Sequence, residues 1–370
     1  MTDHSPENTS SRIVQLDGLR GIAVLFVVCF HYLNNAYSVC PVRSLNALEI
    51  GLKKLTYWGW AGVDLFFILS GFLIASILLN NRPSKKYFTT FYIRRLTRIV
   101  PIYYVLLIVF VAASALFEQR GSKIFAKPID IGWYAGFLQN FQMSIKGYFG
   151  AYGLAPTWSL AVEEQFYLLI PLVIYFLDDK KVLLFCLLCI LLAPVYRTHS
   201  NNWYQEYTHL FSRIDAPCYG VMLALFSRNK HWVVYLKKYG LLLLVLLAGV
   251  LAAFVFWKFK SLNHSIISLL FLSLTWFALH LKPGDLIYRI LTNPFLLKMG
   301  KYSYFFYLFH ILVNGIMFLT LTEYLAPNLE NVKGYLITIL SFGATYLLAS
   351  LSFRYFEGRL INWSHQFKYN

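Results

Sequence analysis

The stretch that decides the fold is residues 16–39, LDGLRGIAVLFVVCFHYLNNAYSV, in which every side chain from Gly21 to Phe30 is apolar or absent. A segment needs about 17 to 25 mainly apolar residues to cross a bilayer as a helix. This stretch follows a polar segment and has no small-residue cleavage pattern, so we interpret it as a retained signal anchor. The polar residues 1–15 are interpreted as a short cytoplasmic tail.

Nine further apolar runs follow, which predicts an all-α integral membrane protein of about ten transmembrane helices with both termini in the cytoplasm. After the first run, near residues 20–39, we expect spans near 60–79, 99–117, 158–177, 182–196, 209–227, 240–257, 264–281, 302–321 and 334–353. The segment 131–143 is interrupted by glycines and amide side chains, so we interpret it as interfacial or re-entrant. The predicted domains are a cytoplasmic tail over 1–15, a membrane domain over 16–357 and a second cytoplasmic tail over 358–370.

Composition excludes a soluble enzyme and a disordered chain, because 58% of the 370 residues are hydrophobic and only 14% are charged. The formal net charge is +16. The predicted cytoplasmic segments carry about twice as many Lys and Arg residues as the outer ones, so the charge indicates membrane orientation and no nucleic-acid partner is expected. Cys186 and Cys189 lie in an apolar run without a second pair, so we interpret them as packing residues and expect no metal.

Ionisable side chains inside the membrane are expensive, so each one is a candidate functional residue. Arg20 and His31 are eleven residues apart, which places them on one face of a helix with an axial separation of about 16 Å. The sequence therefore predicts that the two side chains line one route through the bilayer. The alternative is an arginine that snorkels to the interface and an unrelated histidine in the core.

A second set of charged residues enters from the outer side of the predicted bundle: Asp64, Glu163, Glu164, Arg213 and Asp215. Together with His31 they are predicted to line a vestibule open to the outer face. Adjacent glutamates differ by about 100° on a helix, so we expect only one of the two to face this vestibule. An alternative for Arg213 and Asp215 is that they neutralise each other or the charges around them.

Basic residues gather between the second and third predicted spans. Arg95 and Arg98 lie one helical turn apart just before Pro101, so they face one way and can hold a phosphate through charge-assisted hydrogen bonds. The ligand is either a soluble phosphorylated donor or an anionic lipid headgroup. His310 lies mid-membrane on an aromatic stripe, where it is either a catalyst or a hydrogen-bonded core residue.

Six motifs follow one another along nearly the whole chain: LDGLRGIA (16–23) leading to His31, GVDLFFILSGFLI (62–74), RRLTRIVP (94–101), WSLAVEEQFY (158–167), RIDA (213–216) with Gly220, and GKYSY (300–304) leading to His310. In this order they resemble the acyltransferase family 3 membrane proteins, which transfer acyl groups to exported sugars and other hydroxyl compounds. The end of the chain departs from the pattern, because Glu357 precedes Gly358 and Arg359 where the family often has a nearby proline. The role of Glu357 therefore stays open.

The resemblance implies an enzyme of the bacterial cytoplasmic membrane that takes an acyl group, usually acetyl, from cytosolic acyl-coenzyme A. The chain is similar to stand-alone members without an esterase-like domain, whose acceptors include O-antigen and exopolysaccharide sugars, lipid-linked oligosaccharides and antibiotics. The implied partners are membrane lipids, a carbohydrate or glycolipid acceptor and acyl-coenzyme A. The sequence does not give the acceptor, the acyl chain length or the oligomeric state.

These observations give each candidate residue an expected role. We expect His31 to act as general base, with Asp64, Glu163 or Glu164 orienting its imidazole. Coenzyme phosphates are assigned to Arg20, Lys86, Arg95 and Arg98. The residues expected to bind substrate are Ser70, Trp158, Glu163, Arg213, Tyr302 and His310. Two rivals remain: a proton-coupled secondary transporter or flippase that uses the same acids and histidines, and an unrelated lipid acyltransferase with His310 as catalyst.

Overall fold

The computed structural model describes residues 13–39, 47–117, 124–125, 129–229, 232–234, 246, 249–250, 263–321 and 330–369. Every regular element in these residues is a helix. Seven helical segments are long and apolar enough to cross a membrane. The chain is therefore an integral membrane protein of helices, as its composition predicts.

The longer helices of the described residues carry the bundle. They are α1 (Val14–Val39), α2 (Ala47–Tyr57), α3 (Gly62–Asn80), α4 (Tyr87–Phe117), α7 (Thr157–Phe176), α8 (Asp179–Thr198), α11 (Asp215–Ser227), α13 (Asn263–Leu279), α15 (Pro294–Leu321) and α16 (Glu330–Ser352). Shorter elements join them: η1 (Trp58–Ala61), α5 (Ile131–Ala135), α6 (Gln139–Lys146), η3 (Tyr152–Leu154), α9 (Trp203–Thr208), α10 (Leu210–Arg213), α14 (Leu286–Leu291), the π-helical turn η6 (Phe353–Glu357) and α17 (Gly358–Ser364).

The predicted count of ten spans is not confirmed by these helices. The sixth predicted span, 209–227, is divided into the short helices α10 and α11, because the helix breaks at Ile214. The eighth becomes α13, an apolar helix of 17 residues. The seventh, 240–257, lies almost wholly outside the described residues, as do residues 1–12 of the predicted amino-terminal tail.

Two other predictions can be compared with the described helices. The segment 131–143 is broken into α5 and α6 around Gly136, which agrees with the expectation that it does not cross as one helix. The last predicted span, 334–353, is longer in the structure, because α16 continues through η6 into α17 and the candidate span runs from Gly334 to Ser364. The domain boundary at residue 357 stays a prediction.

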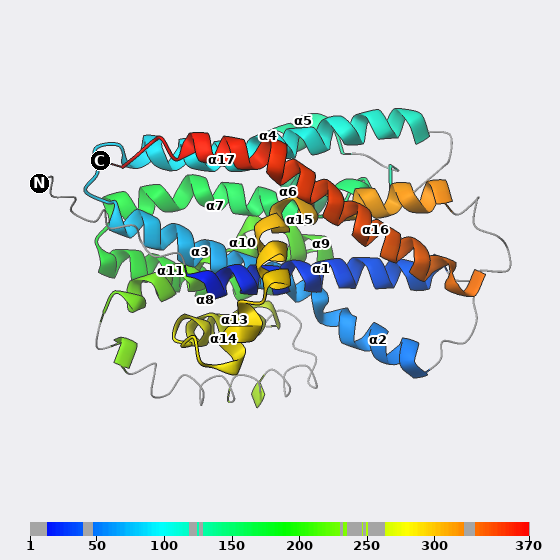
Figure 1. The fold of residues 1–370 in the computed structure, drawn as a ribbon. Coiled ribbons are helices and arrows are strands. Elements are labelled where there is room, and N and C mark those ends of the chain that lie inside the picture. The colour runs from blue at the N-terminus through cyan, green and yellow to red at the C-terminus, as the bar shows by residue number, and fades with distance from the viewer. Residues whose placement is uncertain are drawn as a thin grey trace, which may run out of the picture.

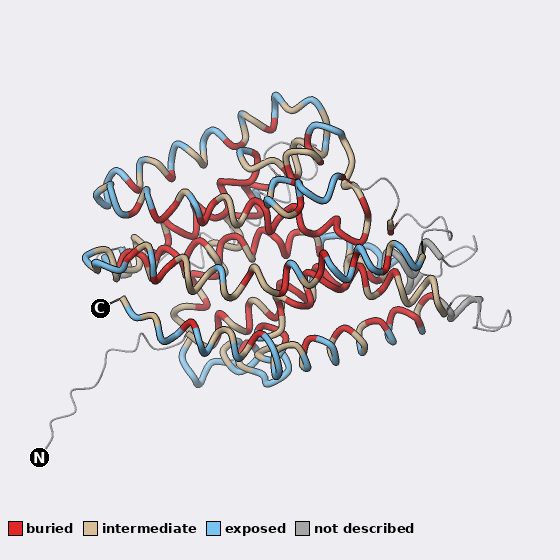
Figure 2. Tube along the Cα trace, turned by 90° about the horizontal axis from the view of Figure 1, so that it is seen from above, coloured by how far each residue is buried: buried red, intermediate tan, exposed pale blue. Residues whose placement is uncertain are grey.

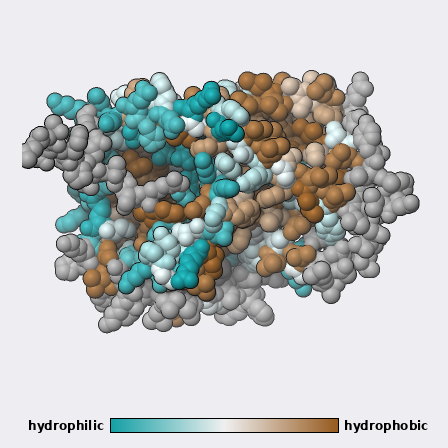
Figure 3. Space-filling view, viewed as in Figure 1, coloured by the Kyte–Doolittle hydropathy of each residue, from teal (hydrophilic) through white to brown (hydrophobic). Residues whose placement is uncertain are grey.

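Helices α1, α3, α4 and α7 run along one common direction, whereas α2 and α16 are inclined to it (Figure 1). Viewed at right angles, buried residues fill the middle of the bundle, whereas the peripheral helices alternate between buried and exposed positions (Figure 2). Hydrophilic residues gather at the end of the bundle where the carboxyl terminus lies, and hydrophobic residues cover much of the remaining face (Figure 3). This distribution is typical of a membrane protein in which one end of the bundle is exposed to water and the apolar surface faces lipid.

Glycines allow two helix pairs to approach closely. In the α1 and α15 pair, a Cβ atom at Gly300 would lie 2.0 Å from the carbonyl oxygen of Asp17. In the α3 and α11 pair, a Cβ atom at Gly71 would lie 2.1 Å from the carbonyl oxygen of Pro217. Small residues at these contacts let helix backbones pack directly, as is common in membranes. The motif glycines therefore have a packing role in both pairs.

Replacing Gly300 with alanine should destabilise the protein by about 1–3 kcal/mol, because the new methyl group meets backbone that must shift. The matched control is Gly343→Ala on α16, where an added Cβ meets nothing within 4 Å. That substitution should stabilise its helix by about 0.5–1 kcal/mol, since alanine is the better helix former. Thermal unfolding in detergent measures both, and equal effects would contradict the close approach of α1 and α15.

Candidate active site

Two cavities lie next to each other in the bundle. The first, here called the arginine cavity, has a volume of about 300 Å³ and is lined by Arg20, Arg95 and Arg98 together with Asp17 and Glu163. The second, here called the histidine cavity, has a volume of about 620 Å³. Its polar lining includes His31, Glu206, Asn263 and His264, set among aromatic side chains.

The two cavities have only Val63 and Tyr307 in common among their lining residues. Arg20 and His31 share α1, but they line different cavities. The two side chains therefore line adjoining cavities that meet at Val63 from α3 and Tyr307 from α15. That Arg20 and His31 line one route through the bilayer stays a prediction.

The arginine cavity is basic because α4 turns two guanidinium groups toward it. Arg95 and Arg98 line the cavity together, as their one-turn spacing predicts. Arg94 lies about 100° around the same helix and donates from Nε to the carbonyl oxygen of Phe367 at 3.0 Å. Burial, together with the neighbouring Arg94 and Arg98, lowers the pKa of His365. This shift reports the positive potential at that end of the bundle.

A hydrogen-bonded group holds Glu163 in the arginine cavity. The Ser70 hydroxyl donates to Glu163 Oε1 at 2.6 Å, and the Tyr167 hydroxyl donates to the same oxygen. The Arg95 guanidinium lies 5.7 Å from the centre of the Tyr167 ring. Glu163 therefore lines the arginine cavity and not the cavity of His31. The side chain leaves α7 on the face that meets α3 and α4.

His31 is paired with a second histidine from α15. His310 Nε2 lies 3.0 Å from His31 Nδ1, and His310 Nδ1 lies 3.0 Å from the Phe306 carbonyl oxygen and 2.9 Å from that of Tyr307. Carbonyl oxygens only accept hydrogen bonds, so His310 carries its proton on Nδ1. A neutral His310 then accepts at Nε2 from a proton on His31 Nδ1, which leaves His31 Nε2 as the nitrogen with the lone pair.

This contact changes the expected partner of His31. Asp64, Glu163 and Glu164 were expected to orient the imidazole, but the side chain in hydrogen-bond contact with His31 Nδ1 is that of His310, which is fully buried. His310 was expected to bind substrate. It lies against His31, and Gly300, nearly three turns earlier on α15, lets this helix approach α1 closely.

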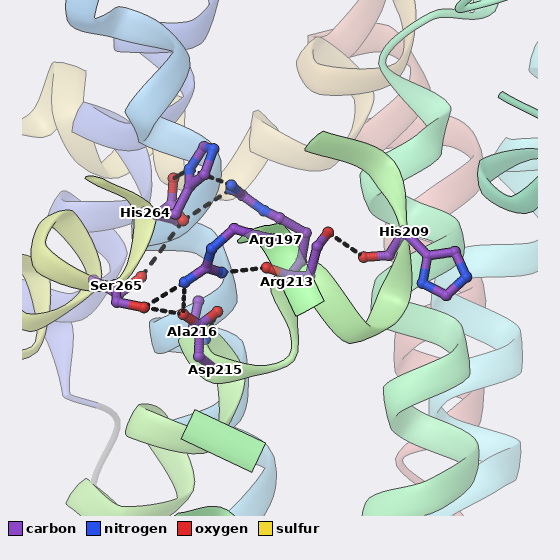
Figure 4. A network of polar contacts seen from close by, with 10 residues as sticks. Arg197, His209, Arg213, Asp215, Ala216, His264 and Ser265 are labelled. Carbon is purple, nitrogen blue, oxygen red and sulfur yellow. Dashed lines mark hydrogen bonds and ion pairs between the residues drawn. The ribbon is translucent and has the colours of Figure 1, made fainter. Parts of the chain in front are cut away.

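A network of buried charges lies behind the histidine cavity (Figure 4). Arg213 donates from Nη2 to Asp64 Oδ1 at 2.8 Å, and Arg197 donates from Nη2 to Asp215 Oδ2 at 3.0 Å. Arg213 and Asp215 therefore do not pair with each other, and each neutralises a charge from another helix, in agreement with the alternative that they neutralise their surroundings. All four side chains are at most 3% exposed. The nearby His209 ring points away from this network (Figure 4).

Arg213 also fixes the second histidine of the histidine cavity. Its Nη1 group contacts His264 Nδ1. A guanidinium group only donates hydrogen bonds, so Nδ1 accepts and a neutral His264 carries its proton on Nε2. The same guanidinium lies 5.6 Å from the centre of the Trp158 ring and 5.4 Å from that of Tyr207. The cavity thus has one histidine with a lone pair on Nε2, His31, and one with a proton there, His264.

The remaining predicted residues lie in different places. Trp158 lines the histidine cavity, where it packs against Tyr207. Six of the predicted residues line neither cavity: Asp64, Lys86, Glu164, Arg213, Tyr302 and His310. Among them, Glu164 is half-buried and its Oε1 atom makes no hydrogen bond within the described residues. Lys86 is exposed before α4, and Tyr302 packs against Tyr346.

The fold and cavities define the class of the protein first: a multi-pass helical membrane protein with a basic cavity beside an imidazole-bearing one. Residues 13–353 match the family model Acyl_transf_3, described as an acyltransferase domain, so the chain belongs to this family. The peptidoglycan O-acetyltransferase OatA of Listeria monocytogenes is 29% identical, with 93% of this chain and 55% of that protein covered. The O-acetyltransferase OatA of Staphylococcus aureus is 29% identical, with 92% and 56% covered.

The chain spans about half the length of the curated relatives it matches. No solved structure matches it.

Sequence reasoning missed three residues that the structure brings to the site. His264 was taken only as the beginning of an apolar run, although an ionisable residue at such a position is a signal in itself. Arg197 lies near the end of α8, where a basic residue is ordinary, so its burial could not be predicted from its position in the sequence. Tyr307 is one of many aromatic residues on α15, and only its neighbours distinguish it.

Proposed function

We propose that this protein transfers an acyl group, acetyl in the first instance, from cytosolic acyl-coenzyme A to a hydroxyl group of an exported carbohydrate or glycolipid. Its site of action is the bacterial cytoplasmic membrane. Family membership supports acyl transfer, and the similar proteins named as O-acetyltransferases support a hydroxyl acceptor. The observation that carries the proposal is the histidine pair, which leaves a basic nitrogen on His31 beside a cavity adjacent to the arginines.

The donor is assigned to the arginine cavity. Arg20, Arg95 and Arg98 supply donors for phosphate oxygens in a partly desolvated site, where charge-assisted hydrogen bonds are strong. The pantetheine arm of the coenzyme spans on the order of 15–20 Å when extended, by ordinary bond lengths. That length matches the rise of about 16 Å between Arg20 and His31 along α1. The thioester can therefore reach His31 while the nucleotide stays among the arginines.

The acceptor is assigned to the histidine cavity, whose aromatic lining suits the apolar faces of sugar rings. The Tyr207 ring stacks on the Trp203 ring and lies tilted against the Trp158 ring, and all three line this cavity. His31 Nε2 takes the proton of the acceptor hydroxyl as its oxygen bonds to the thioester carbonyl carbon. The carbon–sulfur bond then breaks, and the coenzyme sulfur receives the proton from His31. His264, with its proton on Nε2, is placed to donate to the carbonyl oxygen as negative charge develops.

A transfer assay tests this proposal. Purified protein in detergent is incubated with radiolabelled acetyl-coenzyme A and oligosaccharides released from peptidoglycan, and acylated products are identified by mass spectrometry. Covalent transfer without a membrane gradient is expected. A protein that forms no acyl ester with these oligosaccharides or with extracted membrane glycolipids, but moves solute in closed vesicles, would be a transporter, and the proposal would fall.

The arginine cavity gives a prediction about donor binding. Arg95→Ala with Arg98→Ala should raise the KM for acetyl-coenzyme A by about a hundredfold or more, since each of the two lost charged hydrogen bonds is worth about 1.5–3 kcal/mol. The kcat should change much less. Lys86→Ala is the matched control, because Lys86 is exposed outside the cavity. Equal effects of the control and the double variant on KM would place the coenzyme elsewhere.

A further inference from the structure

The boundary between the two cavities has a defined structure. Val63 from α3 and Tyr307 from α15 line both cavities, and Val63 is only 5% exposed. We propose that these two side chains form a neck that selects the acyl group by size as the thioester passes from the arginine cavity to the histidine cavity. This inference rests on the proposed function, and it adds the residues that set donor specificity.

Tyr307 is held in place from both sides of the neck. Its hydroxyl donates to the Pro156 carbonyl oxygen at 3.2 Å, and it also exchanges a hydrogen bond with the Ser159 hydroxyl. Pro156 lines the histidine cavity and Ser159 lines the arginine cavity. On the arginine side, the Phe66 ring packs edge-on against the Tyr307 ring at a centroid distance of 5.9 Å. The ring is thus fixed by three neighbours.

Val63 is fixed as firmly by its backbone. It follows Gly62, where an added Cβ atom would lie 2.5 Å from the carbonyl oxygen of Ala23, so α3 is pressed against α1 at this point. Asp64, the next residue, is held by the ion pair with Arg213 at 2.8 Å. Neither neighbour leaves room for the helix to move away. The width of the neck therefore depends on the size of the side chain at position 63.

The proposed chemistry requires passage through this neck. The phosphate-binding groups line one cavity and the nitrogen that takes the acceptor proton lines the other, so the thioester carbonyl must cross between them. The pantetheine arm is a thin chain, whereas the acyl group at its tip grows with each added methylene. A neck of a buried valine and a hydrogen-bonded tyrosine therefore discriminates among acyl groups by steric exclusion, which is the form of selectivity that cavity walls supply.

The test compares acyl-coenzyme A donors of increasing chain length. Val63→Ala removes two methyl carbons, the number by which a butyryl group exceeds an acetyl group. The ratio of butyryl to acetyl transfer, measured as kcat/KM with the oligosaccharide acceptor, should rise by about tenfold or more. Val63→Leu should lower the propionyl to acetyl ratio by a comparable factor. The matched control is Val162→Ala on α7, because Val162 is fully buried but lines neither cavity.

A further variant, at Tyr307, and a measurement of donor binding test the neck independently of the variants at Val63. Tyr307→Phe keeps the ring but removes the hydroxyl that contacts Pro156 and Ser159, so it should raise the same ratio by a smaller factor. Donor binding is also followed without turnover, as the rise in unfolding temperature with butyryl-coenzyme A relative to acetyl-coenzyme A. This relative rise should be larger in Val63→Ala than in the unaltered protein.

The outcomes separate the neck from the proposed function. Unaltered protein that transfers no acyl group, although it binds both donors, would overturn the proposed function, and the binding ratios would still test the neck. Active protein in which Val63→Ala, Val63→Leu and Tyr307→Phe leave the chain-length ratios at the values of Val162→Ala would overturn the neck and leave acyl transfer intact.

Discussion

Replacing His31 with alanine should abolish measurable acyl transfer while the protein still folds and inserts. A positioned general base contributes about a hundredfold to ten-thousandfold to a rate, and no other nitrogen in the described part of the histidine cavity is shown to hold a lone pair in this way. Removing the imidazole leaves Nε2 of the fully buried His310 without its partner, so the protein should lose about 1–3 kcal/mol of stability. The measurement is kcat with acetyl-coenzyme A, with thermal unfolding as the check on folding.

His310 should behave as a positioning residue in the same assay. His310→Gln keeps a carbonyl oxygen able to accept from His31 Nδ1, whereas His310→Phe keeps only the volume. We expect the glutamine variant to retain far more kcat than the phenylalanine variant, with little difference in KM. A purely structural role predicts that both variants lose activity in proportion to their loss of stability. Full turnover by folded His31→Ala protein would remove His31 from the chemistry and favour the rival catalyst His310.

The second large effect concerns stability. Arg213→Met should destabilise the protein by about 3–5 kcal/mol, because it leaves the buried Asp64 carboxylate without its ion-pair partner. The double variant Arg213→Met with Asp64→Asn should recover part of this loss, since the uncompensated charge is then gone. The three proteins are compared by thermal or denaturant unfolding in one detergent.

An exposed ion pair provides the matched control for that comparison. Lys181 Nζ lies 3.4 Å from Asp178 Oδ2, with side-chain exposures of 67% and 59%. Lys181→Met should therefore leave stability almost unchanged, because water screens both charges. Similar losses in Lys181→Met and Arg213→Met would mean that burial does not decide the effect. A double variant no more stable than Arg213→Met would contradict the pairing with Asp64.

The features predicted most reliably from sequence are those that depend on one helix. Apolar runs of sufficient length predict the membrane helices, and the one-turn spacing of Arg95 and Arg98 predicts their shared cavity. A single helix also predicts that Arg20 and His31 lie on one face. It cannot predict that they line different cavities, because the boundary is made by Val63 and Tyr307 from two other helices.

Contacts between helices explain the remaining errors. Arg213 and Asp215 are two residues apart, yet their partners Asp64 and Arg197 come from α3 and α8. Coulomb attraction depends on distance in space, so sequence proximity misleads when helices pack closely. The contact between His31 and His310 could not be predicted either, because the two residues are 279 apart in sequence and meet only where α1 and α15 pack. Neither histidine has a local pattern that identifies the other.

The two buried ion pairs join α3, α8, α10, α11 and α13 behind one wall of the histidine cavity. Moving any of these helices would separate opposite charges in a medium of low dielectric constant, which costs several kcal/mol. That wall should therefore be a preformed binding surface, which does not rearrange when an acceptor binds. We expect structures with and without a bound sugar to superpose closely there, so that rearrangement during turnover is confined to the side facing the lipid.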